Sequence, residues 1–293
     1  MLGRATVRVP GTCGELVQGT LGGVAFHVTC PIDVYSTVTV EFTEAPGVEH
    51  PPGLTKAGAG ARLALAHLGA RYGARTSVRS DLPAGKGLGS STADIVGAIA
   101  GCALALGEPL DLPTIARLAL AVEPTDGSFF PGIVLFDHRG GQLYEPLGRA
   151  PSLAITVLDF GGEVDTLQFN AVDRTSLLHS LEPEVREALA LVRRGLAAGR
   201  LDLIGRGATL SALANQRVLP KPELPMVLDF ARSVQALGIN VGHSGTVLGV
   251  LLDPARHDAC QVLARARREL PGLELAFACR LTDGGIVAEC PGS

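Results

Sequence analysis

The segment that most constrains the fold of this chain is a glycine-rich loop that runs directly into an apolar helix. Residues 83–89 read PAGKGLG, and residues 90–106 read SSTADIVGAIAGCALAL. A loop that opens a helix leaves several backbone N–H groups unpaired at the positive end of the helix dipole, which suits phosphate groups. The segment therefore predicts a polyphosphate site and, with it, a bound nucleotide.

Two common phosphate loops do not match this segment. A Walker A loop needs glycine at position 80, where the chain has Ser80, and a dinucleotide loop needs glycine at position 90, where it has Ser90. A simpler alternative is a flexible turn in which Ser90 caps the helix. Because twelve consecutive residues, 83–94, each have a use in a phosphate loop, we favour a phosphate site of a different kind.

The rest of the chain alternates between β and α patterns. Its 293 residues suit one large domain or two medium ones. The pattern restarts after residue 150, which predicts domains over 1–150 and 151–293. The expected strands are 5–9, 35–42, 76–79, 130–137, 142–147, 153–160, 246–253, 273–281 and 286–289, and 10–34 reads as mostly turn. The expected helices are 57–72, 90–106, 112–123, 182–198, 200–215, 224–237 and 256–270.

The amino-acid composition limits the kinds of binding partner that we expect. Lys and Arg number 25 against 29 Asp and Glu, and aromatic residues are 4% with no tryptophan. A chain of this composition lacks both an excess of basic residues and the aromatic residues on which bases stack, so we expect no nucleic-acid partner. The longest uncharged apolar run, 95–106, is shorter than the roughly 20 residues of a membrane span, and no signal peptide is recognisable. We therefore expect a cytoplasmic protein with no membrane partner, as a monomer or homodimer.

Three motifs resemble those of the GHMP kinases, the superfamily of galactokinase, homoserine kinase, mevalonate kinase and phosphomevalonate kinase. The pattern P-x-x-x-G-L-G-S-S-x-A fits residues 83–93, a first motif lies at 9–15 (VPGTCGE), and a third lies at 241–246 (VGHSGT). The resemblance covers nearly the whole chain. It implies an α+β fold, with an N-terminal ribosomal-protein-S5-like domain that binds ATP over 1–150 and a C-terminal ferredoxin-like α+β domain over 151–293.

Within that superfamily the motifs are most similar to those of the L-threonine kinases of cobalamin synthesis. The similar segments are 13–19 (CGELVQG), 30–33 (CPID), 85–87 (GKG), 123–126 (EPTD) and 135–137 (LFD). The resemblance implies ATP-dependent phosphorylation of the L-threonine side-chain hydroxyl to O-phospho-L-threonine, which supplies the aminopropanol linker of cobalamin.

Phosphoryl transfer needs a phosphate cradle, a cation and a group that orients or deprotonates the attacking hydroxyl. By resemblance, Ser91 and Glu123 hold Mg²⁺, which needs few protein ligands because it keeps several waters. Asp126 matches the group beside the attacking hydroxyl. The predicted catalytic residues are thus Asp126, Glu123 and Ser91, and the predicted ATP-binding residues are Pro83, Gly85, Lys86, Gly87, Leu88, Gly89, Ser90, Ser91 and Thr92.

The chain departs from the superfamily around the expected base. Other members carry this aspartate later in the chain, and several have a lysine in the first motif where this chain has Thr12. Asp126 is therefore either a true base or an orienting group, and Lys86 is a candidate for the missing charge, with a solvated lysine as the alternative. Taken alone, Glu123 could be a solvated helix end and Asp126 an Asx-type turn.

The acceptor threonine is a zwitterion, which needs an anion for its ammonium group and a donor for its carboxylate. Glu15 and Asp33 are the candidates for the ammonium group, and His243 and Ser244 for the carboxylate. Glu15 could equally cap a turn, and His243 could be a structural hydrogen-bond donor. Two other functions remain open: a homoserine kinase or other small-alcohol GHMP kinase, and a non-catalytic sensor that binds ATP or an amino acid.

Overall fold

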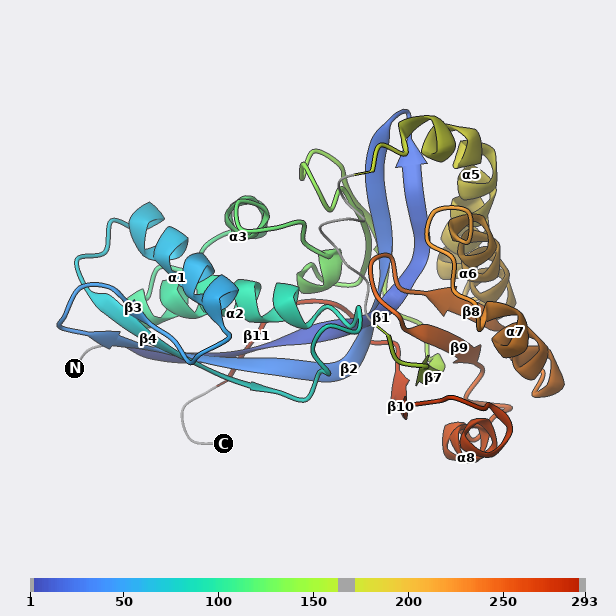
Figure 1. Ribbon diagram of the computed structural model, residues 1–293. Helices are drawn as coiled ribbons and strands as arrows, with labels where there is room; N and C mark the ends of the chain where they lie inside the picture. The colour runs from blue at the N-terminus through green and yellow to red at the C-terminus, as the bar shows by residue number, and fades with distance from the viewer. Residues whose placement is uncertain (1–2, 163–171, 290–293) are drawn as a thin grey trace.

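The computed structural model describes residues 3–162 and 172–289, in which eleven strands form one mixed sheet (Figure 1). The strands are β1 (Arg4–Leu21), β2 (Val24–Thr43), β3 (Val48–Glu49), β4 (Gly73–Ser80), β5 (Ile133–Phe136), β6 (Tyr144–Gly148), β7 (Ala154–Asp159), β8 (Gly238–Val241), β9 (Leu248–Leu252), β10 (Leu275–Arg280) and β11 (Val287–Glu289). Their main path is β10-β7-β9-β8-β1-β2-β4-β3. Strand β11 pairs with β1, and the β5–β6 hairpin pairs with β2.

The helices lie in two groups against this sheet. Within the described residues they are α1 (Thr55–His67), α2 (Ser90–Leu106), α3 (Leu112–Leu120), α5 (Thr175–Ala198), α6 (Leu201–Asn215), α7 (Leu224–Ser233) and α8 (Ala259–Glu269), together with the 3₁₀ turn η1 (Gly127–Phe129). Figure 1 shows α1, α2 and α3 on one face of the sheet near the N-terminus, and α5 to α8 around the C-terminal strands. The α+β fold class is as the sequence predicts.

The long hairpin of β1 and β2 differs from the turn-like segment expected over 10–34. Its strands pair from Arg4 with Glu41 to Leu21 with Val24, so most of that segment is strand. Register shifts between Pro10 and Glu15, and again before Val17, absorb the irregular residues without ending the strand, as β-bulges do.

One sheet joins the two halves of the chain. Strand β8 meets β1 where Glu15 lies opposite Val241, and β11 pairs with the start of β1, where Arg8 lies opposite Val287. The last of the described strands thus lies beside the first. The division into domains over 1–150 and 151–293 stays a prediction.

Helix α2 packs closely on the sheet because glycines face it. A Cβ at Gly97 would lie 2.5 Å from a methyl carbon of Val38, and one at Gly101 would lie 2.7 Å from a methyl carbon of Val40. The helix ends at Leu106, and the next residue, Gly107, adopts the left-handed conformation (φ 75°) typical of helix C-termini. The close approach fixes the start of α2, where the phosphate loop ends.

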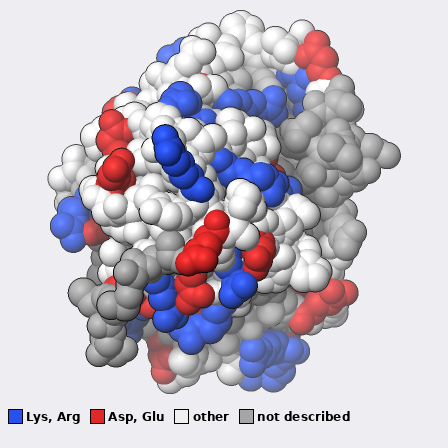
Figure 2. Space-filling view, turned by 90° about the vertical axis from the view of Figure 1, so that its left-hand side faces the viewer, with Lys and Arg blue, Asp and Glu red and all other residues white. Residues whose placement is uncertain are grey.

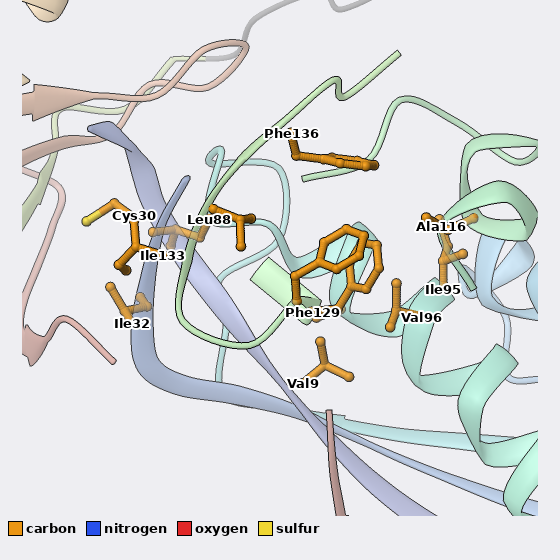
Figure 3. Packing of buried hydrophobic residues seen from close by; sticks show 14 of the residues in the cluster. Val9, Cys30, Ile32, Leu88, Ile95, Val96, Ala116, Phe129, Ile133 and Phe136 are labelled. Carbon is orange, nitrogen blue, oxygen red and sulfur yellow. The ribbon is translucent and has the colours of Figure 1, made fainter. Parts of the chain in front are cut away.

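The core under the site is formed by side chains from both sides of that loop. Figure 3 shows Leu88 of the loop near Ile133, and Phe129 near Val96 of α2. Leu88, Phe129 and Ile133 are all at most 1% exposed. Leu88 therefore anchors an otherwise glycine-rich loop in the hydrophobic core.

The surface carries both signs of charge. On the face that Figure 2 shows, Lys and Arg side chains lie among Asp and Glu side chains. Ion pairs of the described chain include Arg4 with Glu41 at 3.1 Å and Arg75 with Glu49 at 2.8 Å. Among the described residues, none of the helices has both the length and the apolar character that crossing a membrane requires.

Replacement of Gly97 by leucine tests the packing of α2. Because Val38 leaves no room for a side chain, we expect Gly97→Leu to lower the free energy of unfolding by about 1–3 kcal/mol, as overpacked cores do. Ala66→Leu, at an exposed position of α1, should change it by no more than about 0.5 kcal/mol. Urea unfolding of both variants gives the comparison, and equal stability would contradict the close approach.

Candidate active site

The phosphate loop follows β4 and ends at the first turn of α2. Gly85, Gly87 and Gly89 have φ values of 73°, 83° and 69°, a left-handed region that favours glycine. The backbone N–H groups in the first turn of α2 have no hydrogen-bond partner within the helix. The N-cap residue is Gly89, and no side chain caps these N–H groups. The loop therefore has the form of an anion cradle, as the sequence predicts for a nucleotide site.

This loop forms one wall of a cavity of about 550 Å³. Most of the residues singled out from the sequence line it, and Pro83 and Asp33 do not. The lining residues are Glu15, His27, Lys56, Ala84, Gly85, Lys86, Gly87, Leu88, Gly89, Ser90, Ser91, Thr92, Glu123, Pro124, Thr125, Asp126, His138, Arg139, His243 and Ser244. The first, second and third motifs thus converge on one cavity.

Ser91 and Glu123 meet at the start of α2. The Ser91 hydroxyl donates to Glu123 Oε1, and Lys56 Nζ donates to Glu123 Oε2 at 2.5 Å. A hydroxyl and a carboxylate in contact form an oxygen donor set of the kind Mg²⁺ prefers. The pair fits a magnesium site, with Lys56 as a cation already on the far oxygen of Glu123.

Asp126 lies beside the phosphate loop, in the segment between α3 and η1. Its backbone N–H donates to Thr92 Oγ1 at 3.2 Å, which ties it to α2. A Cβ at Gly89 would lie 3.3 Å from Asp126 Oδ2 and 3.1 Å from Thr12 Oγ1. Glycine at position 89 thus lets the loop approach the carboxylate that is expected to face the acceptor.

A buried histidine lies between two carboxylates at this point. His27 Nδ1 is 3.5 Å from Asp126 Oδ1 and 3.6 Å from Glu15 Oε1. Burial, and secondly the negative charge of Asp126, raise the pKa of Glu15 well above its usual value. Glu15 thus tends toward its neutral, protonated form, while Asp126 has an imidazole beside it.

The third motif, 241–246, closes the cavity from the C-terminal half. The N–H groups of Thr246 and Val247 donate to Lys86 O at 3.1 and 3.3 Å. Lys221 Nζ, which is buried, donates to Gly245 O at 2.6 Å, and burial lowers the Lys221 pKa to about 8. His243 and Ser244 line the cavity as a result.

Two residues predicted from the sequence have other positions or partners. Asp33 is exposed and accepts a hydrogen bond from the Arg280 N–H at 2.7 Å, so its assignment to the acceptor is corrected. Lys86 Nζ lies 2.9 Å from Oδ2 of Asp159, a fully buried carboxylate. Because an unpaired buried charge is costly, this ion pair stabilises Lys86 beside Asp159. The hypothesis that Lys86 supplies charge near Asp126 stays a prediction.

Four polar residues of the cavity were not predicted from the sequence: Lys56, His27, His138 and Arg139. Lys56 is 67 positions from its partner Glu123, and His27 is far along the chain from Asp126. His138 and Arg139 directly follow the motif at 135–137, which was the one available signal.

Comparisons with known proteins agree with this geometry. The GHMP kinases N terminal domain matches residues 56–130. The L-threonine kinase of Salmonella typhimurium is 35% identical over 260 residues, 88% of this chain and 86% of that protein. The homoserine kinase of Deinococcus radiodurans is 32% identical over 187 residues, 60% of this chain and 59% of that protein.

A solved structure shows the same fold. The homoserine kinase from Cytophaga hutchinsonii superposes with a TM-score of 0.76 at 17% identity, over 99% of this chain and 98% of that one. The chain belongs to the GHMP kinases. The family, the fold class and the kinase assignment predicted from the sequence are thereby confirmed.

Replacement of Lys86 tests whether its ion pair with Asp159 stabilises the folded protein. Lys86→Met leaves Asp159 buried without its partner, so we expect a loss of stability near the lower end of about 3–5 kcal/mol. Lys86→Met/Asp159→Leu should recover most of it. Lys56→Met is the matched control, because Lys56 is 59% exposed and surface pairs contribute about 0–1 kcal/mol. Equal unfolding midpoints for both single variants would contradict the structural role of Lys86.

Proposed function

We propose that the protein is an L-threonine kinase, which transfers the γ-phosphoryl group of ATP to the side-chain hydroxyl of L-threonine. The product is O-phospho-L-threonine, a precursor of the aminopropanol linker of cobalamin. The observation that carries the proposal is the convergence of the phosphate loop, the Ser91–Glu123 pair and Asp126 on one cavity. The 35% identity to an L-threonine kinase over most of both chains supports the choice of acceptor.

The phosphate loop and the start of α2 are suited to the nucleotide. Backbone N–H groups of residues 87–91 can donate to phosphate oxygens, helped by the helix dipole. Ser91 and Glu123 would hold Mg²⁺, which when bound neutralises charge on the phosphate oxygens. Lys56 occupies only Oε2 of Glu123, so Oε1 and the Ser91 hydroxyl form the face that a metal ion would meet.

The acceptor belongs at the end of the cavity where Asp126, Glu15, His243 and Ser244 lie. Asp126 can accept a hydrogen bond from the attacking hydroxyl and so orient it. Glu15 tends to be neutral in the free protein, because burial raises its pKa, and a nearby ammonium group would stabilise its ionised form. His243 and Ser244, with nearby backbone N–H groups, are our candidates for the carboxylate.

Two variants separate the metal-binding and acceptor-orienting roles. Glu123→Gln removes the proposed metal ligand, so we expect kcat to fall at least about 100-fold, with nucleotide binding partly retained. Asp126→Asn should lower kcat by roughly 100-fold or more with little change in apparent ATP affinity. Steady-state kinetics and ATP titration measure the two effects, and full activity in both variants would overturn these roles.

A panel of acceptors tests the substrate. ADP release with MgATP is measured for L-threonine, L-serine, L-homoserine and mevalonate, and ³¹P NMR identifies each product. We expect phosphothreonine well above the others, because a site that binds one hydroxyl position leaves polar groups unpaired with another.

The other outcomes of the panel identify the alternatives. The match to a homoserine kinase makes L-homoserine the main competitor, and preference for it would replace threonine as the acceptor. Bound ATP with no turnover of any acceptor would instead indicate a sensor built on this fold.

A further inference from the structure

The chain uses lysine at only three positions, and all three lie at the candidate active site. Lysine and arginine together number 25, and of these only Lys56, Lys86 and Lys221 are lysine. Lys56 and Lys86 line the cavity of the phosphate loop, whereas Lys221 donates to Gly245 of the third motif. A compact ammonium group on a flexible stem and a planar guanidinium group are not interchangeable. The place of Lys221 beside the third motif therefore calls for an explanation of its own.

The backbone of Lys221 is held in place by the side chain of Gln216, the residue that follows α6. Gln216 Nε2 donates to Lys221 O at 2.9 Å, and the Lys221 N–H donates to Gln216 Oε1 at 2.6 Å. One amide group thus satisfies both backbone groups of the lysine. Only 6% of Lys221 is exposed. Its side chain therefore extends from a fixed backbone into the protein and not into solvent.

The ammonium group of Lys221 reaches the phosphate loop through one intermediate residue. Its Nζ donates to Gly245 O at 2.6 Å. A Cβ at Gly245 would lie 2.3 Å from the Gly87 Cα, so the two glycine backbones are in direct contact. The next two residues, 246 and 247, donate their N–H groups to Lys86 O at 3.1 and 3.3 Å. A shift of Gly245 would therefore shift the loop that carries the proposed phosphate contacts.

The charge of Lys221 has no close carboxylate partner among the described residues. The acceptor of its hydrogen bond is a neutral carbonyl, and the nearby Asp159 of β7 is paired with Lys86 at 2.9 Å. Burial, opposed by the charges of Glu223 and Asp159, lowers the pKa of Lys221 to about 8, and Lys221 in turn lowers the pKa of His243. Two lysines thus share one fully buried carboxylate, which leaves an excess of positive charge beside the phosphate loop. A buried charge of this kind is costly until an anion approaches it.

We propose that Lys221 is a positioning residue for nucleotide binding, which acts by holding Gly245 against the phosphate loop. With Gly245 fixed, Gly87 and the backbone N–H groups that follow it keep the arrangement that donates to a polyphosphate. The bound polyphosphate in turn supplies, across Gly245, the negative charge that the buried ammonium group lacks. This inference rests on the proposed function, in which the polyphosphate belongs to ATP.

Nucleotide affinity tests the role of the ammonium group. Lys221→Met keeps a stem of similar length but removes the charge and the donor, so we expect the Kd of a non-hydrolysable ATP analogue with Mg²⁺ to rise about tenfold or more. Arg217→Met is the matched control, because Arg217 belongs to the same segment, is half-exposed and pairs with Glu184. Calorimetric titration should give the wild-type Kd for this control. An unchanged Kd in folded Lys221→Met would overturn the proposal.

A lysine that only stabilised the fold would give a different pattern. Removal of a buried charge without a carboxylate partner costs the folded state little, so the urea midpoint of Lys221→Met should stay at the wild-type value. A lower midpoint with unchanged nucleotide affinity would assign Lys221 to the stability of the fold and contradict a positioning role.

Hydrogen exchange tests the contact without nucleotide. The N–H groups of Thr246 and Val247 are bonded to Lys86 O, so a looser third motif should exchange them faster in Lys221→Met. Gln216→Ala removes the support of the Lys221 backbone and leaves the ammonium group. It should give a smaller change of the same sign, with several-fold weaker nucleotide binding. If Lys221→Met does not fold, wild-type exchange and affinity in Gln216→Ala would rule out the positioning role.

The pH dependence of binding tests the charge. Because the pKa of Lys221 is about 8, the ammonium form predominates below that pH and is lost above it. A polyphosphate favours the charged form, so binding should take up protons near this pH, and affinity should fall as the pH rises through it. Calorimetry in two buffers of different ionisation enthalpy measures the uptake. We expect it in the wild type and in Arg217→Met, and equal uptake by Lys221→Met would contradict the role of the charge.

Failure of the proposed function gives a separate result. Weaker nucleotide binding and faster exchange in Lys221→Met, in a protein that does not phosphorylate L-threonine, would overturn the proposed acceptor and leave the role of Lys221 standing. Phosphothreonine production with an unchanged KM for ATP in Lys221→Met would do the reverse.

Discussion

The candidate site depends on a backbone contact between two loops from opposite halves of the chain. Lys86 O accepts hydrogen bonds from the N–H groups of Thr246 and Val247, and a Cβ at Gly245 would lie 2.3 Å from the Gly87 Cα. Such an approach requires glycine on both sides. Because the phosphate loop packs against the third motif, this contact fixes the position of the loop relative to the candidate acceptor residues His243 and Ser244. The Lys86–Asp159 ion pair and the hydrogen bond of Lys221 to Gly245 reinforce it.

Those parts of the fold and of the candidate site that are formed by sequence motifs could be predicted from the sequence. The phosphate loop, α2 and the convergence of Ser91, Glu123 and Asp126 follow from motifs whose residues are local or recur in a known order. Strand β8 was missed because its four residues are too few for a period to show. The strand character of 10–34 was missed because bulges let glycine and proline residues sit within a long hairpin.

The residues that pair with the polar side chains of the site were harder to predict, because the two members of each pair are far apart in the sequence. A lysine in a glycine loop looks solvated, and only the structure brings the buried Asp159 to Lys86. His27 had no motif around it, yet strand pairing in the β1–β2 hairpin places it opposite Gln18, two residues along β2 from Thr29, the partner of Glu15. Asp33 shows the converse: it lies in a family-like motif, but its carboxylate binds the Arg280 N–H outside the cavity.

Two lysines of the cavity are already paired with carboxylates in the free protein, which affects how the proposed nucleotide would bind. Lys56 is paired with Glu123, and Lys86 with Asp159. The charge of each ammonium group is thus partly neutralised by a carboxylate, and for Lys86 that carboxylate is fully buried. For the proposed nucleotide, we therefore expect much of the anion stabilisation to come from backbone N–H groups, the dipole of α2 and the proposed divalent ion. We therefore expect such a site to prefer the metal complex of the proposed nucleotide over the free nucleotide, because Lys56 is already paired with the carboxylate of Glu123.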